Sequence, residues 1–97
     1  MIIEILEGHV TQERWDNFEQ AYRKCLKNIP LQCIQNFLIQ DIKDKTLWRI
    51  ISIWKDEDSL NEAMSKLEKI TCTEVYHLVD VEPSHRIFRV RDQHMHV

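Results

Sequence analysis

The chain has 97 residues, of which 43% are hydrophobic and 30% are charged, and its formal net charge at pH 7 is -3. This length is typical of one domain. A protein that binds nucleic acid needs a basic surface to displace the counterions of the phosphates, so the acidic balance argues against that class. It also argues against a polybasic membrane patch, and no segment reaches the roughly 18 apolar residues of a membrane span. We therefore expect neither nucleic acid nor a membrane as a partner.

The cysteines and the N-terminus indicate the compartment. The first ten residues, MIIEILEGHV, are too short and too acidic a stretch for a signal peptide. Cys25, Cys33 and Cys72 form an odd set without C-x-x-C spacing, whereas a small secreted domain normally pairs its cysteines. We expect a cytoplasmic protein whose thiols pack as small apolar side chains, with a reactive thiol as the alternative.

The first two predicted elements are a strand and an amphipathic helix. Residues 2–8 are apolar on both faces, which predicts a strand covered on both sides. Thr11 offers a helix N-cap, and Pro30 ends the helix that follows it. One stripe of this helix is apolar at steps of three and four residues, and its members are Trp15, Phe18, Tyr22, Cys25, Leu26 and Ile29.

Two further strands, a second helix and a last strand follow. Residues 33–41 and 47–54 predict strands joined by a hairpin loop rich in Asp and Lys. Asp56 begins the second helix, with Ser59 as the partner of a weak cap. The apolar stripe of that helix contains Leu60, Ala63, Met64 and Leu67. A fourth strand is predicted over residues 72–82 and ends at Pro83, which leaves residues 84–97 as a flexible tail or a short extra strand near 86–91.

These elements, in the order β-α-β-β-α-β, predict a ferredoxin-like α+β domain over residues 1–83. Right-handed crossovers place both helices on one face of a four-stranded antiparallel sheet with the order 4-1-3-2. The other face then has no cover within the chain, although every strand is apolar on both faces. We therefore expect a homodimer that forms through the open sheet face. In this arrangement Cys33 and Cys72 lie at opposite edges of the sheet, too far apart for a disulfide.

Aromatic residues provide a candidate binding site. Trp48, Ser52 and Trp54 share one face of the third strand, where they could line a pocket together with Trp15, Phe18 and Tyr22 of the first helix. Aromatic walls with few polar groups suit a small apolar or aromatic ligand. Plain core packing is the alternative reading of the same residues.

Five polar residues have both a functional and a structural reading. Asn36 lies in mid-strand, where it needs a hydrogen bond from a ligand, a water or a neighbour. His77 is either a general base or a histidine satisfied at the interface. Arg49 either forms an ion pair across the dimer or clamps a carboxylate ligand. His94 and His96 lack a third ligand and a fixed geometry, so we expect no metal site there.

The end of the third strand carries a resemblance to a known family. Trp54 followed by Lys-Asp-Glu-Asp-Ser-Leu over residues 55–60, together with the order of elements, resembles the antibiotic biosynthesis monooxygenase family of the dimeric α+β barrel superfamily. The resemblance covers roughly residues 1–80. Ser52 stands where many members carry a glutamate. Ala63 stands where they often carry a histidine and where the haem-degrading branch carries a tryptophan, and Thr73 replaces a histidine of that branch.

The resemblance implies a dimeric monooxygenase that acts on a small aromatic or quinol-type compound with no cofactor. Such an enzyme needs groups that stabilise a substrate anion, and Asn36, Tyr76 and Arg49 are of the right type. The departures at Ser52 and Ala63 favour the alternative of a non-catalytic ligand-binding or sensor module with the same fold. An RNA-binding domain of the RRM type shares the order of elements, but the chain lacks its basic sheet and Gly-Phe run.

Overall fold

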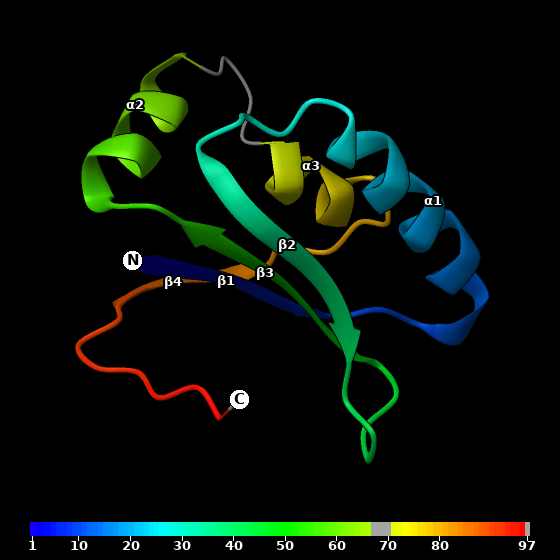
Figure 1. Ribbon diagram of the computed structural model, residues 1–97. Coiled ribbons are helices and arrows are strands. Elements are labelled where there is room, and N and C mark those ends of the chain that lie inside the picture. The colour runs from blue at the N-terminus through cyan, green and yellow to red at the C-terminus, as the bar shows by residue number, and fades with distance from the viewer. Residues whose placement is uncertain (67–70, 97) are drawn as a thin grey trace.

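The computed structural model describes residues 1–66 and 71–96. These residues form strands β1 (Ile2–His9), β2 (Cys33–Gln40), β3 (Leu47–Trp54) and β4 (Ser84–Arg89), and helices α1 (Trp15–Leu26), α2 (Glu57–Lys66) and α3 (Thr71–His77) (Figure 1). A short 3-10 turn, Gln12–Arg14, precedes α1. The order is therefore β-α-β-β-α-α-β.

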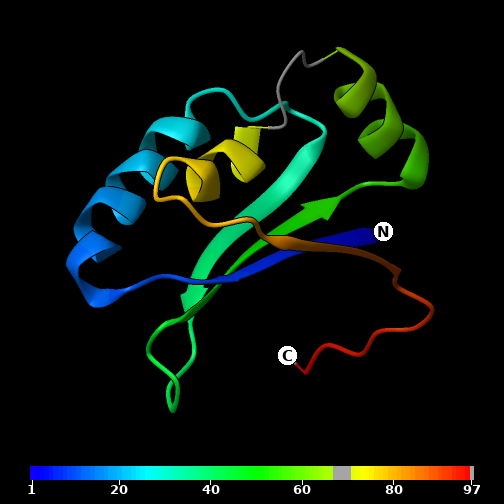
Figure 2. The ribbon, with the colours of Figure 1, turned by 180° about the vertical axis from the view of Figure 1, so that it is seen from behind.

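The four strands form one antiparallel sheet with the order β2-β3-β1-β4. This is the predicted order, and the helices cover one face of the sheet as predicted (Figures 1 and 2). Helices α1 and α3 lie together over one end of the sheet, and α2 lies over the other end. The predicted ferredoxin-like α+β fold is confirmed. One predicted element differs, the strand over residues 72–82.

The predicted strand over residues 72–82 is wrong, because this segment begins with α3. Its buried side chains recur at the three- and four-residue steps of a helix, and they are Cys72, Val75, Tyr76 and Val79. His77 is exposed at the end of α3 instead of lying beside Val75 and Val79 on a strand. The fourth strand of the sheet is β4, so the sheet extends past residue 83 and the extra-strand reading of residues 84–97 holds for Ser84–Arg89.

A tight turn ends α3. Asp80 has a φ of 58°, the left-handed conformation that often follows a helix. The amide of Val81 donates to the carbonyl of Tyr76 (3.0 Å) and that of Asp80 to the carbonyl of His77 (3.1 Å). This pair of bonds is a Schellman motif, and it satisfies carbonyls that the helix leaves unpaired.

The helix starts differ in how well the sequence predicts them. The amide of Ser59 donates to Asp56 Oδ1 (2.7 Å), which confirms the cap of α2. Thr11 precedes the 3-10 turn but its side chain makes no cap bond. Helix α1 ends at Leu26, short of Pro30. The expected stripe residue Leu67 lies outside the described residues.

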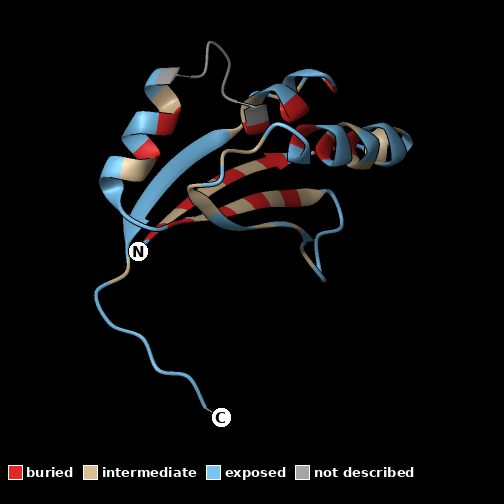
Figure 3. Ribbon diagram, turned by 45° about the horizontal axis from the view of Figure 1, so that its top comes forward, coloured by how far each residue is buried: buried red, intermediate tan, exposed pale blue. Residues whose placement is uncertain are grey.

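Two buried clusters hold the helices on the sheet (Figure 3). The larger cluster joins α1 and α3 to β1 and β3, and Phe18 and Tyr76 have no exposed surface within it. The smaller cluster, under α2, consists of Ile2, Trp54, Leu60 and Ala63. Because fewer buried side chains hold α2, we expect α2 to separate from the sheet more easily than α1 or α3.

The close approach of α3 to β1 requires glycine at position 8. A Cβ atom on Gly8 would lie 2.8 Å from Cγ1 of Val81 and 3.0 Å from two ring carbons of Tyr76. The Tyr76 ring is fully buried and cannot move aside without disturbing the core. The single glycine of the chain thus allows α3 to rest on the sheet.

The sheet face away from the helices is not covered by any element within residues 1–66 and 71–96. It carries Ile3, Ile5, Phe37, Ile39, Leu47, Ile51, Ile53 and Phe88. These side chains are half-buried or exposed, and together they form what we call the open face. No helix within residues 1–66 and 71–96 has the length and apolar character needed to cross a bilayer.

Candidate functional site

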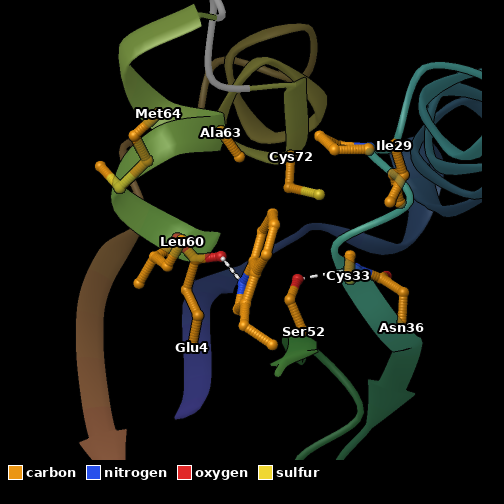
Figure 4. Close-up of a pocket in the computed structure, with 11 residues that line it drawn as sticks. Glu4, Ile29, Cys33, Asn36, Ser52, Leu60, Ala63, Met64 and Cys72 are labelled. Atoms are coloured by element: carbon orange, nitrogen blue, oxygen red, sulfur yellow. Dashed lines mark hydrogen bonds between the residues drawn. The ribbon is translucent and has the colours of Figure 1, made fainter. Parts of the chain in front are cut away.

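A small cavity lies between the sheet, α2 and the start of α3 (Figure 4). Its apolar wall includes Trp54, Leu60, Ala63 and Met64, and Cys33 and Cys72 also line it. Its polar lining consists of Glu4, Asn36 and Ser52. The enclosed volume is about 20 Å³, which is room for about one water molecule.

Ser52 is the last member of a chain of hydrogen bonds. The Tyr22 hydroxyl donates to Asn36 Oδ1 (2.7 Å), and Asn36 Nδ2 donates to Ser52 Oγ (2.7 Å). A neighbouring side chain therefore satisfies Asn36, one of the predicted possibilities. Because Ser52 Oγ already accepts a bond, its own proton is available to a group in the cavity.

Burial keeps the first member of this chain neutral. Desolvation raises the pKa of Tyr22 to about 12, and the nearby thiols of Cys72, Cys25 and Cys33 act in the same direction. At neutral pH the Tyr22 hydroxyl is therefore a hydrogen-bond donor. Its direction of donation orders Asn36 and, through it, Ser52.

We expect this shift to make the folded chain less stable in alkali. Between pH 10 and 12 the folded protein retains the Tyr22 proton that the unfolded chain has lost, so the free energy of unfolding falls as pH rises. The stabilisation that the protonated Tyr22 hydroxyl gives the folded protein is fully present below pH 10 and is lost as the pH passes about 12. Urea unfolding of wild type and Tyr22→Phe across this range measures it, and identical slopes for the two proteins would contradict it.

Glu4 is a buried carboxylate at the cavity wall. Its side chain is 7% exposed. Trp54 Nε1 donates to Oε1 (3.2 Å), and His85 Nε2 donates to Oε2 (2.7 Å). The sequence analysis did not select Glu4, although an acidic residue between Ile2 and Leu6 on one face of a strand was a signal that it is buried and partnered.

The predicted aromatic pocket divides into two parts. Trp54 and Ser52 line the cavity, and Tyr22 supports it through Asn36. Trp15, Phe18 and Trp48 pack as core, with the Trp48 ring centroid 5.9 Å from that of Trp15 and 5.7 Å from that of Phe18. The Trp15 indole donates to the carbonyl of Val10 (2.8 Å). The core-packing alternative therefore describes these three residues.

Three predicted polar candidates lie outside the cavity. The Tyr76 hydroxyl donates to the carbonyl of Trp48 (2.8 Å) and so fastens α3 to the sheet. His77 pairs with Glu82 at the surface (2.9 Å). Arg49 lies on the side of the open face and forms an ion pair with Glu7 of the same chain.

The C-terminal histidines contact each other in an exposed segment, with 2.9 Å between His94 Nε2 and His96 Nδ1. In residues 1–66 and 71–96, no three His, Cys, Asp or Glu side chains come together as a metal-ligand cluster.

The cysteines lie closer together than the sequence analysis predicted. Cys33 and Cys72 line the same cavity, because Cys72 belongs to α3 and not to an edge strand. The sulfur atoms of Cys25 and Cys72 are 3.5 Å apart, and no disulfide joins the three residues. Burial raises the pKa of the Cys33 thiol, so this thiol stays protonated at neutral pH.

Comparison with known proteins identifies the fold. No protein-family profile matches the chain, and no curated protein is similar to it in sequence. A conserved protein from Methanosarcina mazei Go1 superimposes with a TM-score of 0.72 and 20% identity, over 91% of this chain and 90% of that one. A candidate antibiotic biosynthesis monooxygenase from Deinococcus radiodurans gives a TM-score of 0.76 and 10% identity, over 100% and 99% of the two chains.

SnoaB, a cofactor-independent oxygenase from Streptomyces nogalater, superimposes with a TM-score of 0.70 and 13% identity, over 95% of each chain. The chain therefore has the fold of the antibiotic biosynthesis monooxygenases, as the resemblance around Trp54 implied. At these identities the similarity establishes the fold, and the site must establish the chemistry.

Proposed function

We propose that the chain is a small cofactor-independent monooxygenase that oxidises a hydroquinone or a related electron-rich phenol in the cavity under α2. The fold it shares with SnoaB supports an oxygenase of this kind. The observation that carries the proposal is the hydrogen-bond chain from Tyr22 through Asn36 to Ser52, which ends in a donor in a largely apolar cavity. A donor in such a place stabilises the oxygen anion of an ionised phenol.

The proposed reaction needs no reductant other than the substrate. A hydroquinone and dioxygen give a hydroxyquinone and water. The ring loses four electrons and dioxygen gains four, with one oxygen atom bound to the ring and the other released as water. The protein contributes by removing the hydroxyl proton, stabilising the resulting anion and excluding bulk water.

A substrate of this size requires the cavity to widen. Ligand sites for drug-sized molecules occupy about 300–1,000 Å³, far more than the enclosed 20 Å³. The side that can move is α2, which the small cluster around Trp54 and Leu60 and the exposed ion pair between Arg89 and Glu57 hold on the sheet. Met64 is the flexible member of this wall, and rotation about its side-chain bonds enlarges the space without moving the backbone.

Oxygen consumption tests this function. Wild-type protein, treated with chelator and freed of flavin, is mixed with a panel of hydroquinones in an oxygen electrode. We expect substrate-dependent uptake, and Ser52→Ala should lower kcat about 100-fold because it removes one donor to the developing anion. Ser65→Ala, on the exposed side of α2, is the matched control and should keep the wild-type rate. Equal rates for Ser52→Ala and wild type would contradict the role of Ser52.

The same experiment distinguishes the alternative of a non-catalytic ligand-binding or sensor module. The apolar lining favours this alternative, as do Ser52 and Ala63, which stand where many members of the resembled family carry a glutamate and a histidine. Saturable binding of a hydroquinone without oxygen uptake or product would support this alternative, and rapid product formation would eliminate it.

We further propose that two copies of the chain associate through the open face. The register places Phe37, Ile51 and Ile5 in one row across β2, β3 and β1, so the apolar surface is continuous. A continuous apolar surface of this kind on a small domain is typical of a protein interface. Two identical faces can pair about a twofold axis, which closes the assembly at a dimer.

A further inference from the structure

We propose that Glu4 is the base that takes the hydroxyl proton of the substrate, and that His85 is a positioning residue that holds Glu4 and connects it with solvent. This inference rests on the proposed function, because it assigns the proton acceptor that the oxygenase reaction requires. Glu4 and His85 are 81 positions apart in sequence and meet only because β4 pairs with β1.

Glu4 and Ser52 form a complementary pair. They are direct cross-strand partners on β1 and β3, and both line the cavity (Figure 4). One offers a carboxylate that accepts a proton, and the other offers a hydroxyl that donates a hydrogen bond. A phenolic oxygen bound beside both can lose its proton to Glu4 while Ser52 stabilises the charge left behind.

The carboxylate is held from two neighbouring strands. Trp54 on β3 donates to Oε1, and His85 on β4 donates to Oε2. Each carboxylate oxygen can accept more than one hydrogen bond, so these contacts fix the orientation of Glu4 and leave it able to accept a proton. A base fixed in this way needs no reorganisation when the substrate arrives.

His85 joins this buried group to the surface. The side chain of His85 is 34% exposed, whereas that of Glu4 is 7% exposed. Because the partly exposed imidazole exchanges protons with water, the tautomer of His85 that carries its proton on Nδ1 can accept the carboxyl proton of Glu4 at Nε2 and release the Nδ1 proton to water. The other titratable groups that face the cavity are Cys33 on β2 and Cys72 on α3. Farther along β4, Arg89 pairs with Glu57 of α2.

The proton transfer is balanced. The O–H bond of the substrate breaks, its electron pair stays on the phenolic oxygen, and a new O–H bond forms on Glu4. Dioxygen then accepts the electrons of the substrate anion as described above. Release of the proton through His85 returns Glu4 to the carboxylate for the next turnover.

The first arm of the test uses oxygen uptake. Glu4→Gln keeps an oxygen for Trp54 but cannot take a proton, so we expect kcat to fall at least about 100-fold. His85→Gln should lower kcat about tenfold with little change in KM, and added imidazole should restore the rate because His85 is partly exposed. His9→Gln, which alters a histidine paired with Asp44 at the surface, is the matched control. Glu4→Gln at the wild-type rate, or no imidazole rescue, would overturn the respective assignment.

The second arm does not depend on turnover. It measures the Kd of 4-nitrophenol by tryptophan fluorescence while the pH rises through the ionisation of the phenol. Wild type should bind the neutral form of 4-nitrophenol. Its affinity for 4-nitrophenol should therefore fall about tenfold per pH unit once the pH exceeds the pKa of the free phenol. The Glu4→Gln variant has no carboxylate to repel the phenolate. Its affinity for 4-nitrophenol should therefore fall less steeply with pH than that of wild type, or rise. Identical pH dependences would overturn the role of Glu4.

The two arms separate the two ideas. If wild type consumes no oxygen but shows the predicted difference from Glu4→Gln in phenol binding, the proposed function is wrong and the assignment of Glu4 as a proton acceptor stands. If wild type consumes oxygen and Glu4→Gln matches it in both arms, the proposed function stands and the assignment of Glu4 is wrong.

Discussion

Replacing Ile51 with aspartate is expected to abolish the proposed pairing of two copies through the open face. Ile51 lies on β3 at the centre of the open face, with Phe37 on one side and Ile5 on the other. The substitution would bury an unpaired carboxylate from each copy at the interface, which costs several kcal/mol. The dimer Kd should therefore rise by at least about 100-fold.

Sedimentation at micromolar concentration measures this change. Leu78→Asp, after the end of α3 on the helix-covered side and 71% exposed, is the control that adds the same charge away from the open face and should leave the association unchanged. A wild-type monomer, or a dimer in Ile51→Asp, would show that the open face is not the contact between copies.

The second large effect is expected for Phe18→Ala. Phe18 has no exposed surface, and its ring contacts those of Trp48 and Tyr76 at centroid distances of 5.7 and 4.8 Å. Its truncation leaves a cavity where α1 and α3 meet the sheet, at a cost of about 3–5 kcal/mol. That is a large part of the roughly 5–15 kcal/mol that stabilises a typical domain.

Urea unfolding checks the prediction for Phe18. The matched control is Leu78→Ala, since Leu78 is 71% exposed after the end of α3, and we expect a change within about 0.5 kcal/mol there. If Phe18→Ala lowered the free energy of unfolding by less than about 1 kcal/mol, α1 and α3 would not share the core described above.

The β1, β2 and β3 strands were predictable because their residues leave little choice. Ile-rich segments that are apolar on both faces suit a covered sheet and not an amphipathic helix. Segment 72–82 was ambiguous, because Val75, Val79 and Val81 alternate like a strand while Cys72, Val75, Tyr76 and Val79 also follow a helical period. The helix Thr71–His77 has only seven residues, so the helical period repeats too few times for the sequence to distinguish a helix from a strand. The packing of Tyr76 against Gly8 in the folded chain favours the helix.

The candidate site was predictable only where one strand determines it. Ser52 and Trp54 alternate on β3, so their shared face followed from the period of a strand, and the polar chain from Asn36 was one of the expected possibilities. The contact of Glu4 with His85 was not predictable, since it depends on β4 lying beside β1. Cys72 reached the cavity for a similar reason, because its place follows from α3.

The measurement that tests the central claim most directly is isotope tracing of the reaction with labelled dioxygen. Wild-type protein is incubated with a hydroquinone under this gas, and mass spectrometry follows the product. A hydroxyquinone that carries one labelled oxygen atom, with the second label in water, is the result expected of a monooxygenase that uses its substrate as the only reductant. A product without label, or no product beyond that formed without protein, would contradict the proposed function.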